Sequence, residues 1–434
     1  MLNKSQYEFD DRRDRHLVIG AGFCGLGVMA SLVRHGIPFD AVEATDAVGG
    51  NWRHGVYESA HIISSRRTTE YADWPMPADY PDFPSAEQML AYLEGYADHF
   101  RLRDHITFRT RVSAVTPADG GAWWVELEGG VVVANGHHWD RRWPSYPGTF
   151  DGEVIHSKDY KRADQLTGKR VLVVGGGNSG CDLAVAASRV GAASHISLRR
   201  GYWFLPKTML GVPTVELVKP WMPVSLQRVA MRGLLRITVG PYEQYGLQRP
   251  THRLFERHPT INTELLSGLR HGRVTPHPDI ARYDGSRVVF TDGTSVEVDL
   301  IACATGFHVS FPFLPEGLIG YRDGVPQLVG GLLLPDHANI YFFGTGQPRY
   351  GAGPLITAGA EAVSTMITAQ RDLERPLGGL LQRIGVSTPQ THVQDPHAVL
   401  RQLKAARWLI PRLPKVARWI PRGPIRDRAR GKVA

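Results

Sequence analysis

The chain has 434 residues, of which 42% are hydrophobic and 21% charged, a balance that suits two or three globular domains and excludes a fibrous or wholly disordered protein. Its cysteines, Cys24, Cys181 and Cys303, lie far apart and form no CxxC pair, which argues against a disulfide scaffold, a dithiol reductase and a structural zinc site. We therefore expect no metal. The formal net charge of +8 is concentrated in residues 401–434, which hold eleven Lys or Arg and one acid, so the near-neutral remainder does not predict nucleic-acid binding.

The first recognisable unit lies at residues 16–43. An apolar run at 16–19 predicts a strand, an apolar-periodic stretch at 26–35 predicts a helix, and 39–43 predicts a second strand. Between the first strand and the helix stand Gly20, Gly22 and Gly25, with Phe23 and Cys24 inside the turn. Strand, GxGxxG turn, helix and strand in this order predict a dinucleotide-binding βαβ unit.

A second unit repeats this order about 150 residues later. Residues 171–174 predict a strand, a helix continues to about residue 190, and 195–198 predict the next strand. The turn between strand and helix contains Gly175, Gly177, Asn178, Ser179 and Gly180. The alternative is a pair of glycine-rich loops in an ordinary α/β sheet. The physical argument favours nucleotides, because such a turn brings backbone N–H groups and a helix N-terminus close to a pyrophosphate.

The ends of the two second strands predict different ligands. Glu43 ends the first unit, where a carboxylate accepts hydrogen bonds from ribose hydroxyls, so this unit predicts FAD. Arg199 and Arg200 end the second unit, where two guanidiniums suit a 2′-phosphate, so this unit predicts NADP in preference to NAD. The alternative for the arginines is a solvated strand end.

These units predict an α/β fold with two Rossmann-like dinucleotide-binding domains, the NADP domain being inserted into a split FAD domain. Apolar runs at 131–134, ending in Asn135-Gly136, and at 299–303, ending in Ala-Thr-Gly, predict strands that return to the first domain. Residues 288–294 predict a hairpin with an Asp-Gly turn. The predicted parts are 1–160 (FAD), 161–291 (NADP), 292–400 (FAD again) and the basic tail, 401–434.

A motif between the two units identifies a family. Phe150, Gly152, His156 and Tyr160 match the pattern F-x-G-x-x-x-H-x-x-x-[YF] immediately before the second glycine turn. In this motif and in the two dinucleotide-binding units on either side of it, the chain resembles the flavin-containing monooxygenases, which are class B flavoprotein monooxygenases. The resemblance covers roughly residues 14–370. His156 and Tyr160 are better interpreted as residues that set cofactor geometry than as acid–base catalysts, and no catalytic acid or base is predicted.

The resemblance implies an enzyme that uses FAD, NADPH and dioxygen. Such an enzyme forms a flavin hydroperoxide that oxygenates a soft nucleophile, an amine nitrogen or a sulfide sulfur, on a small lipophilic substrate. Baeyer–Villiger monooxygenases, a sister group, typically carry tryptophan at the position of Tyr160, so ketone oxygenation is the alternative. An uncoupled NADPH oxidase that releases hydrogen peroxide, and a non-catalytic nucleotide-binding membrane partner, are further alternatives. A homodimer is also implied.

The resemblance adds cofactor-binding positions beyond the two glycine turns. Gly50, Asn51 and Trp52 match an element that contacts flavin or pyrophosphate, and Val112 matches a residue that packs on adenine. The strand-end positions are Gly136, Thr305 and Gly306. Cys24 and Cys181 are interpreted as small fillers at helix starts, not as redox thiols.

One position departs from the family pattern. Many relatives place an asparagine facing the flavin six residues after the tyrosine that corresponds to Tyr57, whereas this chain has Ile63 there. Ser64 and Ser65 are the nearby polar pocket candidates, but neither offers an amide. The departure puts the family's usual handling of oxygen and substrate in doubt. The following Arg66-Arg67 pair is either a charged lip of the pocket or a solvated loop.

The tail at 401–434 contains a loose repeat of Trp, Pro and Arg around Trp408 and Trp419. Its prolines argue against one continuous helix. Tryptophans flanked by cations suit the headgroup region of an anionic membrane, and the alternative is that both tryptophans pack on the protein's own surface. The chain shows no apolar run of membrane-spanning length and no apolar leader. We expect a cytoplasmic protein with peripheral contact at the inner membrane surface.

Overall fold

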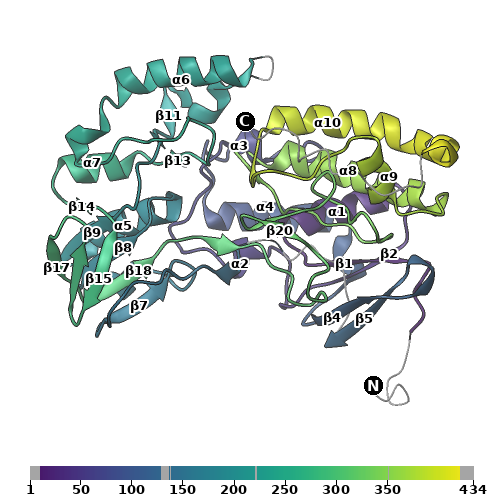
Figure 1. Cartoon of the computed structure of the whole chain (residues 1–434), viewed down its shortest axis with the longest axis horizontal. Helices are drawn as coiled ribbons and strands as arrows, with labels where there is room; N and C mark the ends of the chain where they lie inside the picture. The colour runs from purple at the N-terminus through teal and green to yellow at the C-terminus, as the bar shows by residue number, and fades with distance from the viewer. Residues whose placement is uncertain (1–9, 129–135, 137, 220–221, 350, 421–434) are drawn as a thin grey trace, which may run out of the picture.

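The computed structural model describes residues 10–128, 136, 138–219, 222–349 and 351–420. Two lobes lie side by side (Figure 1). In the first lobe, three parallel strands form one sheet: β1 (His16–Ile19), β2 (Phe39–Val42) and β3 (Ile106–Thr107). Helices α1 (Phe23–Arg34), α4 (Ala86–His99) and α8 (Gly353–Arg371) pack around it. A Cβ on Gly27 would lie 2.5 Å from Ile356, so glycine is what lets α1 and α8 pack so closely.

The second lobe contains a five-stranded parallel sheet in the order β14-β9-β8-β18-β7. Its strands are β7 (Glu153–His156), β8 (Arg170–Val174), β9 (Ala193–Ser197), β14 (Thr275–His277) and β18 (Leu300–Cys303). Helix α5 (Asn178–Val190) packs on β8 and β9. The predicted α/β class with two Rossmann-type units is confirmed by this arrangement.

Two strands lie in a different sheet from the one expected. β7 and β18 are assigned by sequence to the first domain, but β18 pairs with β7 on one side and with β8 on the other, so that Ala302 lies opposite both Ile155 and Val173. All four residues of β18 are buried, which requires a neighbouring strand on each side. The second sheet therefore extends beyond the predicted limits of 161–291 at both ends. The expected strand at 131–134 lies outside the described residues.

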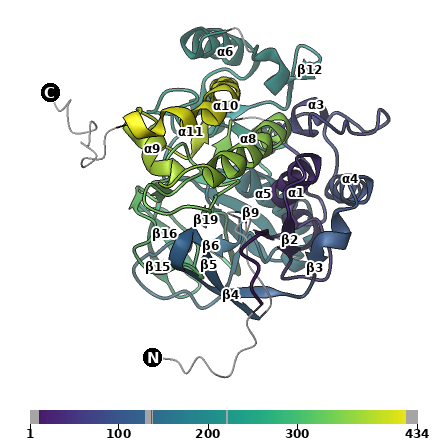
Figure 2. The same ribbon diagram turned by 90° about the vertical axis from the view of Figure 1, so that its right-hand side faces the viewer.

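A long insertion follows β9 and includes the helix at the top of the molecule in Figure 1 and Figure 2. Its elements are β10 (Phe204–Leu205), β11 (Thr208–Met209), β12 (Val212–Pro213), η5 (Thr214–Leu217), α6 (Val224–Thr238), η6 (Tyr242–Tyr245), β13 (Thr260–Ile261) and α7 (Glu264–Arg270). The expected hairpin with an Asp-Gly turn is present as β16 (Arg287–Phe290) and β17 (Ser295–Glu297), joined by β15 (Ile280–Asp284) in a small antiparallel sheet.

Short elements connect the lobes and complete the first one. Around the first sheet lie α2 (Asn51–His54), α3 (Arg66–Thr69), η2 (Leu102–His105), β4 (Arg111–Pro117), η3 (Asp119–Gly121) and β5 (Trp123–Glu128). The connections contain β6 (Asp140–Arg141), η4 (Ala163–Leu166), β19 (Phe307–His308), β20 (Tyr321–Arg322), β21 (Val325–Pro326), β22 (Gln347–Pro348), α9 (Leu377–Arg383) and β23 (Val393–Gln394).

The C-terminal segment packs on the first lobe more extensively than its composition suggested. Helix α10 (Pro396–Leu409) crosses the predicted start of the tail at residue 401 and is followed by η7 (Ile410–Arg412), α11 (Leu413–Val416) and η8 (Ala417–Trp419). Pro411 and Pro414 fall in the first turns of η7 and α11, where proline is tolerated, so helical turns follow one another despite the prolines.

The contact with the fold is made by aliphatic side chains of this segment. Ile410 and Leu413 are buried in an apolar cluster with Val329 and Met366, whereas Trp408 and Trp419 remain 62% and 75% exposed. The alternative that both tryptophans pack on the protein's own surface is therefore wrong. None of the helices in the described ranges is both long and apolar enough to span a bilayer.

Candidate dinucleotide sites and the pocket between the lobes

The first glycine turn closes against a second one. Gly20 has φ 95°, and a Cβ on Gly50, whose own φ is 52°, would lie 2.8 Å from the Cα of Gly22. The N–H of Gly49 donates to the carbonyl of Ala21 at 3.0 Å, which holds the two turns together. Only glycine fits this contact, which forms a side-chain-free cradle at the N-terminus of α1.

Glu43 lies buried at the edge of this cradle. Its Oε2 accepts from the backbone N–H of Ala21 at 2.7 Å, and its Oε1 accepts from the N–H and the hydroxyl of Thr45 at 3.0 and 2.9 Å. A carboxylate has about four acceptor sites, so one remains for a further donor such as a ribose hydroxyl. The sequence-predicted role of Glu43 is compatible with this geometry.

The remaining residues predicted for the first site surround the same turn. Phe23 and Cys24 open α1, Gly25 is buried in its first turn, and Trp52 packs against the apolar cluster that contains α1. Burial raises the pKa of the Cys24 thiol to about 12, which suits a filler and not a redox thiol. Val112 packs on a separate apolar cluster that includes Ile19, the residue before the turn.

Asn51 receives a contact that the sequence did not indicate. The ammonium of Lys158 donates to its Oδ1 at 3.3 Å and to the carbonyl of His138 at 3.0 Å. Burial lowers the pKa of Lys158, and the neighbouring cations Lys161 and Arg141 lower it further. The motif segment between the units thus places a cation beside the Gly49-Gly50 turn. Gly136 has φ 65°, and within the described ranges no atom outside its chain neighbours lies within 4 Å of where its Cβ would be.

The second glycine turn has the same construction. A Cβ on Gly175 would lie 2.6 Å from the carbonyl oxygen of Ala304, and one on Gly180 would lie 2.0 Å from that of Gly175, whereas Gly177 faces open space. Gly177 is the N-cap of α5, and no side chain caps that helix end. The Asn178 side chain accepts from the N–H of Ile261 at 2.8 Å, so it holds the insertion against the turn. Cys181 is buried, and that burial raises its pKa well above the ordinary value.

Arg199 and Arg200 lie in the bend after β9, two and three residues beyond its last residue, Ser197, and a third arginine joins them. Burial lowers the pKa of Arg200, and the like charges of Arg257 and Arg199 lower it further. The Nε of Arg200 is buried without a hydrogen-bond partner in the described part of the chain, and its guanidinium lies 5.5 Å from the ring centre of Tyr202. A cluster of cations with an unsatisfied donor suits an anion such as a 2′-phosphate.

The family motif forms β7 and the turn after it. Gly152 is required sterically, because a Cβ there would lie 2.6 Å from the carbonyl oxygen of Asp299 and from the ring of Phe150. Phe150 pairs with Gly285 at the start of this segment and packs on the cluster beneath the sheet. Glycine and phenylalanine therefore fix how β7 joins β18.

His156 connects the motif to the strand end at Gly306. It is fully buried; its Nδ1 accepts from the N–H of Lys158 at 3.2 Å, so its Nε2 carries the proton and donates to the carbonyl of Gly306 at 3.1 Å. Burial lowers the pKa of His156, which keeps the ring neutral near pH 7. The Thr305 hydroxyl donates to the carbonyl of Arg142. These contacts fix the turn after β7 against the strand end at Gly306.

Tyr160 and Tyr57 meet between the lobes, 5.5 Å apart between ring centres. The Tyr57 hydroxyl donates to Oδ2 of Asp182 on α5 at 2.6 Å, and the Asn262 amide donates to Oδ1 at 2.8 Å. Burial raises the pKa of Asp182. Sequence analysis missed Asp182 and Asn262; the available signal was an acid standing among small apolar residues inside the helix that follows the glycine turn. Beside this junction, Lys207 hydrogen-bonds His61 across the lobes.

Ile63 packs on the apolar cluster of the second lobe, together with Tyr57. The nearby serines are engaged locally, because Ser64 hydrogen-bonds Thr69 at 2.7 Å and Ser65 hydrogen-bonds Thr68 at 3.2 Å. No amide side chain therefore replaces the family's asparagine at these three positions. Arg66 donates to the carbonyl of Pro77, and Arg67 lies 3.9 Å from Glu216 of the insertion while its side chain remains 74% exposed, as a solvated loop would have it.

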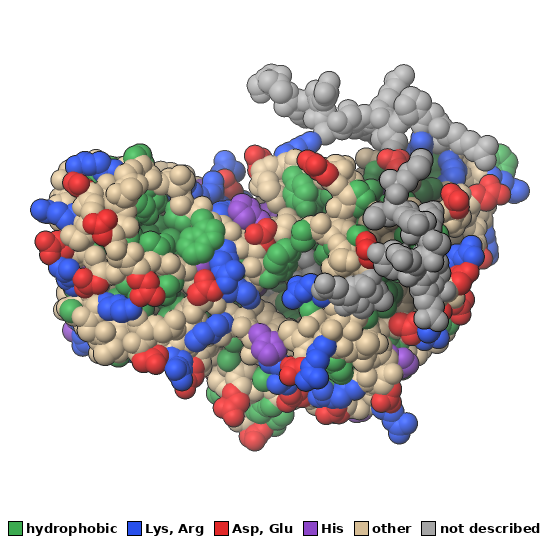
Figure 3. All heavy atoms as spheres, turned by 90° about the horizontal axis from the view of Figure 1, so that it is seen from below, with side chains coloured by type: hydrophobic (Ala, Val, Ile, Leu, Met, Phe, Trp, Pro, Cys, Tyr) green, Lys and Arg blue, Asp and Glu red, His purple; other side chains and the backbone are tan. Residues whose placement is uncertain are grey.

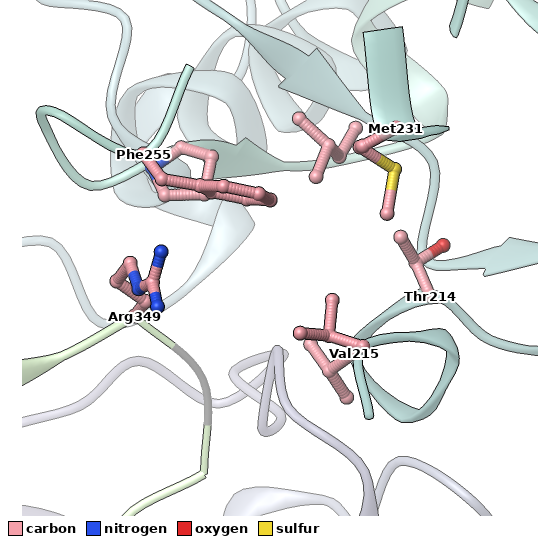
Figure 4. A pocket seen from close by; sticks show the side chains of 8 residues that line it. Thr214, Val215, Met231, Phe255 and Arg349 are labelled. Carbon is pink, nitrogen blue, oxygen red and sulfur yellow. The ribbon is translucent and has the colours of Figure 1, made fainter. Parts of the chain in front are cut away.

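A pocket lies between the insertion and the loop before α8 (Figure 4). Its wall is apolar except for Thr214 and Arg349; the other lining residues are Leu205, Val215, Val218, Met231, Phe255 and Pro259. The guanidinium of Arg349, which is 3% exposed, forms an ion pair with Asp395 and lies 5.0 Å from the ring centre of Phe255. Phe255 has φ 67°, a strained conformation of the kind that collects at functional sites. The sequence did not single out these residues.

Asp395 shows why the C-terminal segment matters to this pocket. Its Oδ1 caps α10 by accepting from the N–H groups of His397 and Ala398, while its Oδ2 holds Arg349. β22 and β23 pair beside this contact. Within the described ranges, no group of three or more His, Cys, Asp or Glu side chains is placed to hold a metal.

Comparisons with known proteins agree with this architecture. Residues 13–336 match the family model FMO-like, flavin-binding monooxygenase-like. The chain is 32% identical over 342 residues to flavin-containing monooxygenase 5 of Homo sapiens, covering 70% of this chain but 64% of that protein. It is 32% identical over 332 residues to indole-3-pyruvate monooxygenase YUCCA1 of Oryza sativa subsp. japonica, covering 72% and 82%. The S-allyl-L-cysteine S-oxygenase structure from Allium sativum aligns with TM-score 0.66 at 20% identity, covering 95% and 94%, and shares the fold.

Proposed function

Because the chain belongs to the flavin-binding monooxygenase-like family, we propose that it is an FAD- and NADPH-dependent monooxygenase that oxygenates a soft nucleophile with dioxygen. Since it spans 64% of the length of the human relative, its activity and substrate are proposals for this chain alone. The observation that carries the proposal is the pairing of two glycine cradles, at Gly22 and Gly177, each opening a helix whose N-terminus no side chain caps.

The residues present fit both cofactors. The Gly22–Gly50 contact leaves a cradle that any side chain would fill, and Glu43 retains an acceptor site, which together suit a flavin dinucleotide. The unsatisfied Nε of Arg200 beside Arg199 suits the 2′-phosphate of NADPH. We assign the first unit to FAD and the second to NADPH on these grounds.

Bound FAD supplies two-electron transfer from NADPH and activation of dioxygen, so the protein's task is to bind, orient and exclude water. Tyr57 and Asp182 hold the two lobes in one arrangement, and His156 holds the strand end at Gly306 with its Nε2 proton. Lys158 places a positive charge beside Asn51 at the first cradle. None of these residues needs to act as an acid or a base.

The substrate we propose is a small lipophilic amine or sulfide. The membership of the chain in the flavin-binding monooxygenase-like family supports this, whereas the pocket in Figure 4, about 10 Å³ in volume, is too small to hold such a molecule. Ketone oxygenation is the alternative, and Tyr160 at the final motif position argues against it. The test is a side-by-side assay of a thioether and a cyclic ketone with product identification. A sulfoxide without an ester or lactone is the expected result; an ester or lactone alone would overturn it.

Ile63 supports a second candidate function, release of hydrogen peroxide without substrate oxygenation. Ile63 packs on the second lobe, and the hydroxyls of Ser64 and Ser65 are engaged with threonines. The ratio of peroxide formed to NADPH consumed separates the two functions. We expect the ratio to fall when the correct substrate is added. A ratio of one with every thioether and amine tried, and no oxygenated product, would favour the oxidase.

We further propose a cytoplasmic homodimer that contacts an anionic membrane through residues 401–434. The exposure of Trp408 and Trp419, each with an arginine over its ring, supports the membrane contact. Replacing both tryptophans with serine should reduce sedimentation with anionic vesicles at low salt; unchanged sedimentation would remove the tail from the contact. Light scattering should give about twice the 48.1 kDa chain mass, and a single-chain mass would overturn the dimer.

A further inference from the structure

Helix α6 has an inner face that belongs to the fold. Gln227, Met231 and Leu235, spaced four residues apart, are the buried residues of this helix. Met231 also lines the pocket between the lobes. At 100° per residue these three positions form one stripe, so the opposite side of the helix points away from the protein.

The outer face of α6 is apolar as well, which is unusual for a helix on a surface. Val229 and Ile237 are 69% and 84% exposed, and Leu226 is exposed on the same side. Gly233 lies between them and is exposed too. The spacing of 226, 229, 233 and 237 makes a continuous stripe along the helix. Solitary exposed apolar residues need no explanation, but an aligned stripe indicates a surface that something covers.

Arginines run beside this stripe. Arg228, Arg232 and Arg236 are again four residues apart, on the side of the helix between the buried stripe and the apolar one. Arg228 donates to the carbonyl of Leu254, whereas Arg232 and Arg236 are exposed and form no ion pair with any residue in the described ranges. No residue of α6 is acidic. The covering partner is therefore negatively charged as well as apolar.

A hairpin beside α6 presents a similar side chain. β11 and β12 form a two-stranded hairpin with Leu210 and Gly211 at its tip. Leu210 is 79% exposed and has φ 53°, a conformation that disfavours a branched residue, so the structure holds an apolar side chain outward at a cost. Figures 1 and 2 both place this hairpin next to α6 at the upper edge of the second lobe.

The opposite face of the molecule has a different surface. Figure 3, seen from below, shows acidic and basic side chains intermixed over the visible surface. On α6, by contrast, apolar side chains form one stripe and arginines form a separate stripe beside it. It matches helices that lie flat in the headgroup region, with the apolar side in the acyl boundary and arginines at the phosphates.

We propose that α6 and the tip of the β11–β12 hairpin dock on an anionic lipid bilayer surface, with α6 lying in the plane of the interface. A second copy of the chain is disfavoured as the occupant, because a symmetric α6 pair would bring like-charged arginine rows together. The docked helix would have its outer face on lipid and Met231 in the pocket.

The test compares sedimentation of the full chain with vesicles of phosphatidylglycerol and phosphatidylcholine mixed equally, and with phosphatidylcholine alone. One variant carries Val229→Ser and Ile237→Ser, and a second carries Arg232→Gln and Arg236→Gln. Because these side chains are exposed, both variants should fold like the wild type, which thermal melting checks. Residues 401–434 are unchanged in every sample, so a loss of binding reports on α6 and not on the tail.

Matched controls lie elsewhere on the surface. Ile384→Ser removes an aliphatic side chain that is 42% exposed, and Arg282→Gln with Arg287→Gln removes two charges from the β15–β16 hairpin. We expect the arginine variant to bind mixed vesicles about thirtyfold more weakly, at about 1 kcal/mol per charge. The serine variant should weaken binding at high salt as well, and the controls should bind like wild type. Equal binding by wild type and both α6 variants, or a change confined to dimer formation in solution, would overturn the proposal.

Discussion

The hydroxyl of Tyr57 lies 2.6 Å from Oδ2 of Asp182, across the boundary between the two lobes and 125 residues apart in the chain. The Asn262 amide satisfies the other carboxylate oxygen. This buried group thus receives one donor from the loop after the first glycine turn and one from the insertion. A shift of either lobe would break at least one of these hydrogen bonds, so the pair reports on how the two nucleotide units are held together.

Replacing Tyr57 with phenylalanine should lower the free energy of unfolding by about 1–3 kcal/mol, because it leaves a buried carboxylate oxygen with one donor fewer. Chemical denaturation of the two proteins measures the difference. Tyr321→Phe is the matched control, since Tyr321 is exposed and its loss should change stability by less than about 0.5 kcal/mol. Equal stability of wild type and Tyr57→Phe would mean that this contact does not hold the lobes.

Asp182 should also give the protein a pH dependence of a definite sign. Burial raises its pKa in the folded state, so the folded protein binds this proton more tightly than the unfolded chain does. Stability contributed by the group is therefore greatest below its ordinary pKa and falls as pH rises through the raised one. Comparing Asp182→Asn with wild type between about pH 4 and 7 should show a smaller loss in the variant. A parallel pair of curves would contradict this.

Gly50→Ala should abolish retention of the yellow cofactor during purification. The added Cβ would lie 2.8 Å from the Cα of Gly22 and force the two turns apart. Gly36→Ala is a stringent control, because Gly36 has a similar positive φ of 60° but no atom within 4 Å of the new Cβ. Both changes carry the same backbone strain of roughly 1 kcal/mol, and only the first closes the cradle. The ratio of flavin absorbance to protein absorbance measures the result.

Arg200→Gln should raise the KM for NADPH roughly ten- to hundredfold while leaving that for NADH nearly unchanged, because only NADPH carries the phosphate that the guanidinium would bind. Arg199→Glu should act in the same direction. Arg189→Gln, an exposed arginine of α5 paired with Glu264, is the control and should affect neither coenzyme. Equal effects of Arg200→Gln on the two coenzymes would remove Arg200 from the site.

Ile410→Ala should destabilise the whole first lobe, by about 2–5 kcal/mol, because Ile410 is completely buried among side chains from α8 and the loop at Val329. Trp408→Ala, two residues earlier and exposed, should change stability by no more than about 0.5 kcal/mol. Thermal unfolding of both variants measures the contrast. A small effect at Ile410 would mean that the C-terminal segment does not contribute to the stability of the first lobe.

The parts of this protein that could be predicted from residue order are those built within some thirty residues of chain. In each βαβ unit the strand, glycine turn, helix and second strand are consecutive in the sequence. The conformational freedom that Gly20 or Gly175 gives its turn is likewise a local property. The motif around Gly152 and His156 was recognisable for the same reason, because its spacing is fixed along one strand and its turn. The α/β class followed from these units, and the structure agrees with it.

The parts that could not be predicted depend on distant segments meeting. An apolar run such as 300–303 fits either sheet equally well, and only its pairing with β7 and β8 decides between them. The same holds for Tyr57 with Asp182 and for Arg349 with Asp395. It also holds for the tail, which is anchored by Ile410 and not by Trp408. The sequence shows, from its hydrophobicity or charge, that a side chain needs a partner. Which partner it contacts is determined only by how the lobes pack in three dimensions.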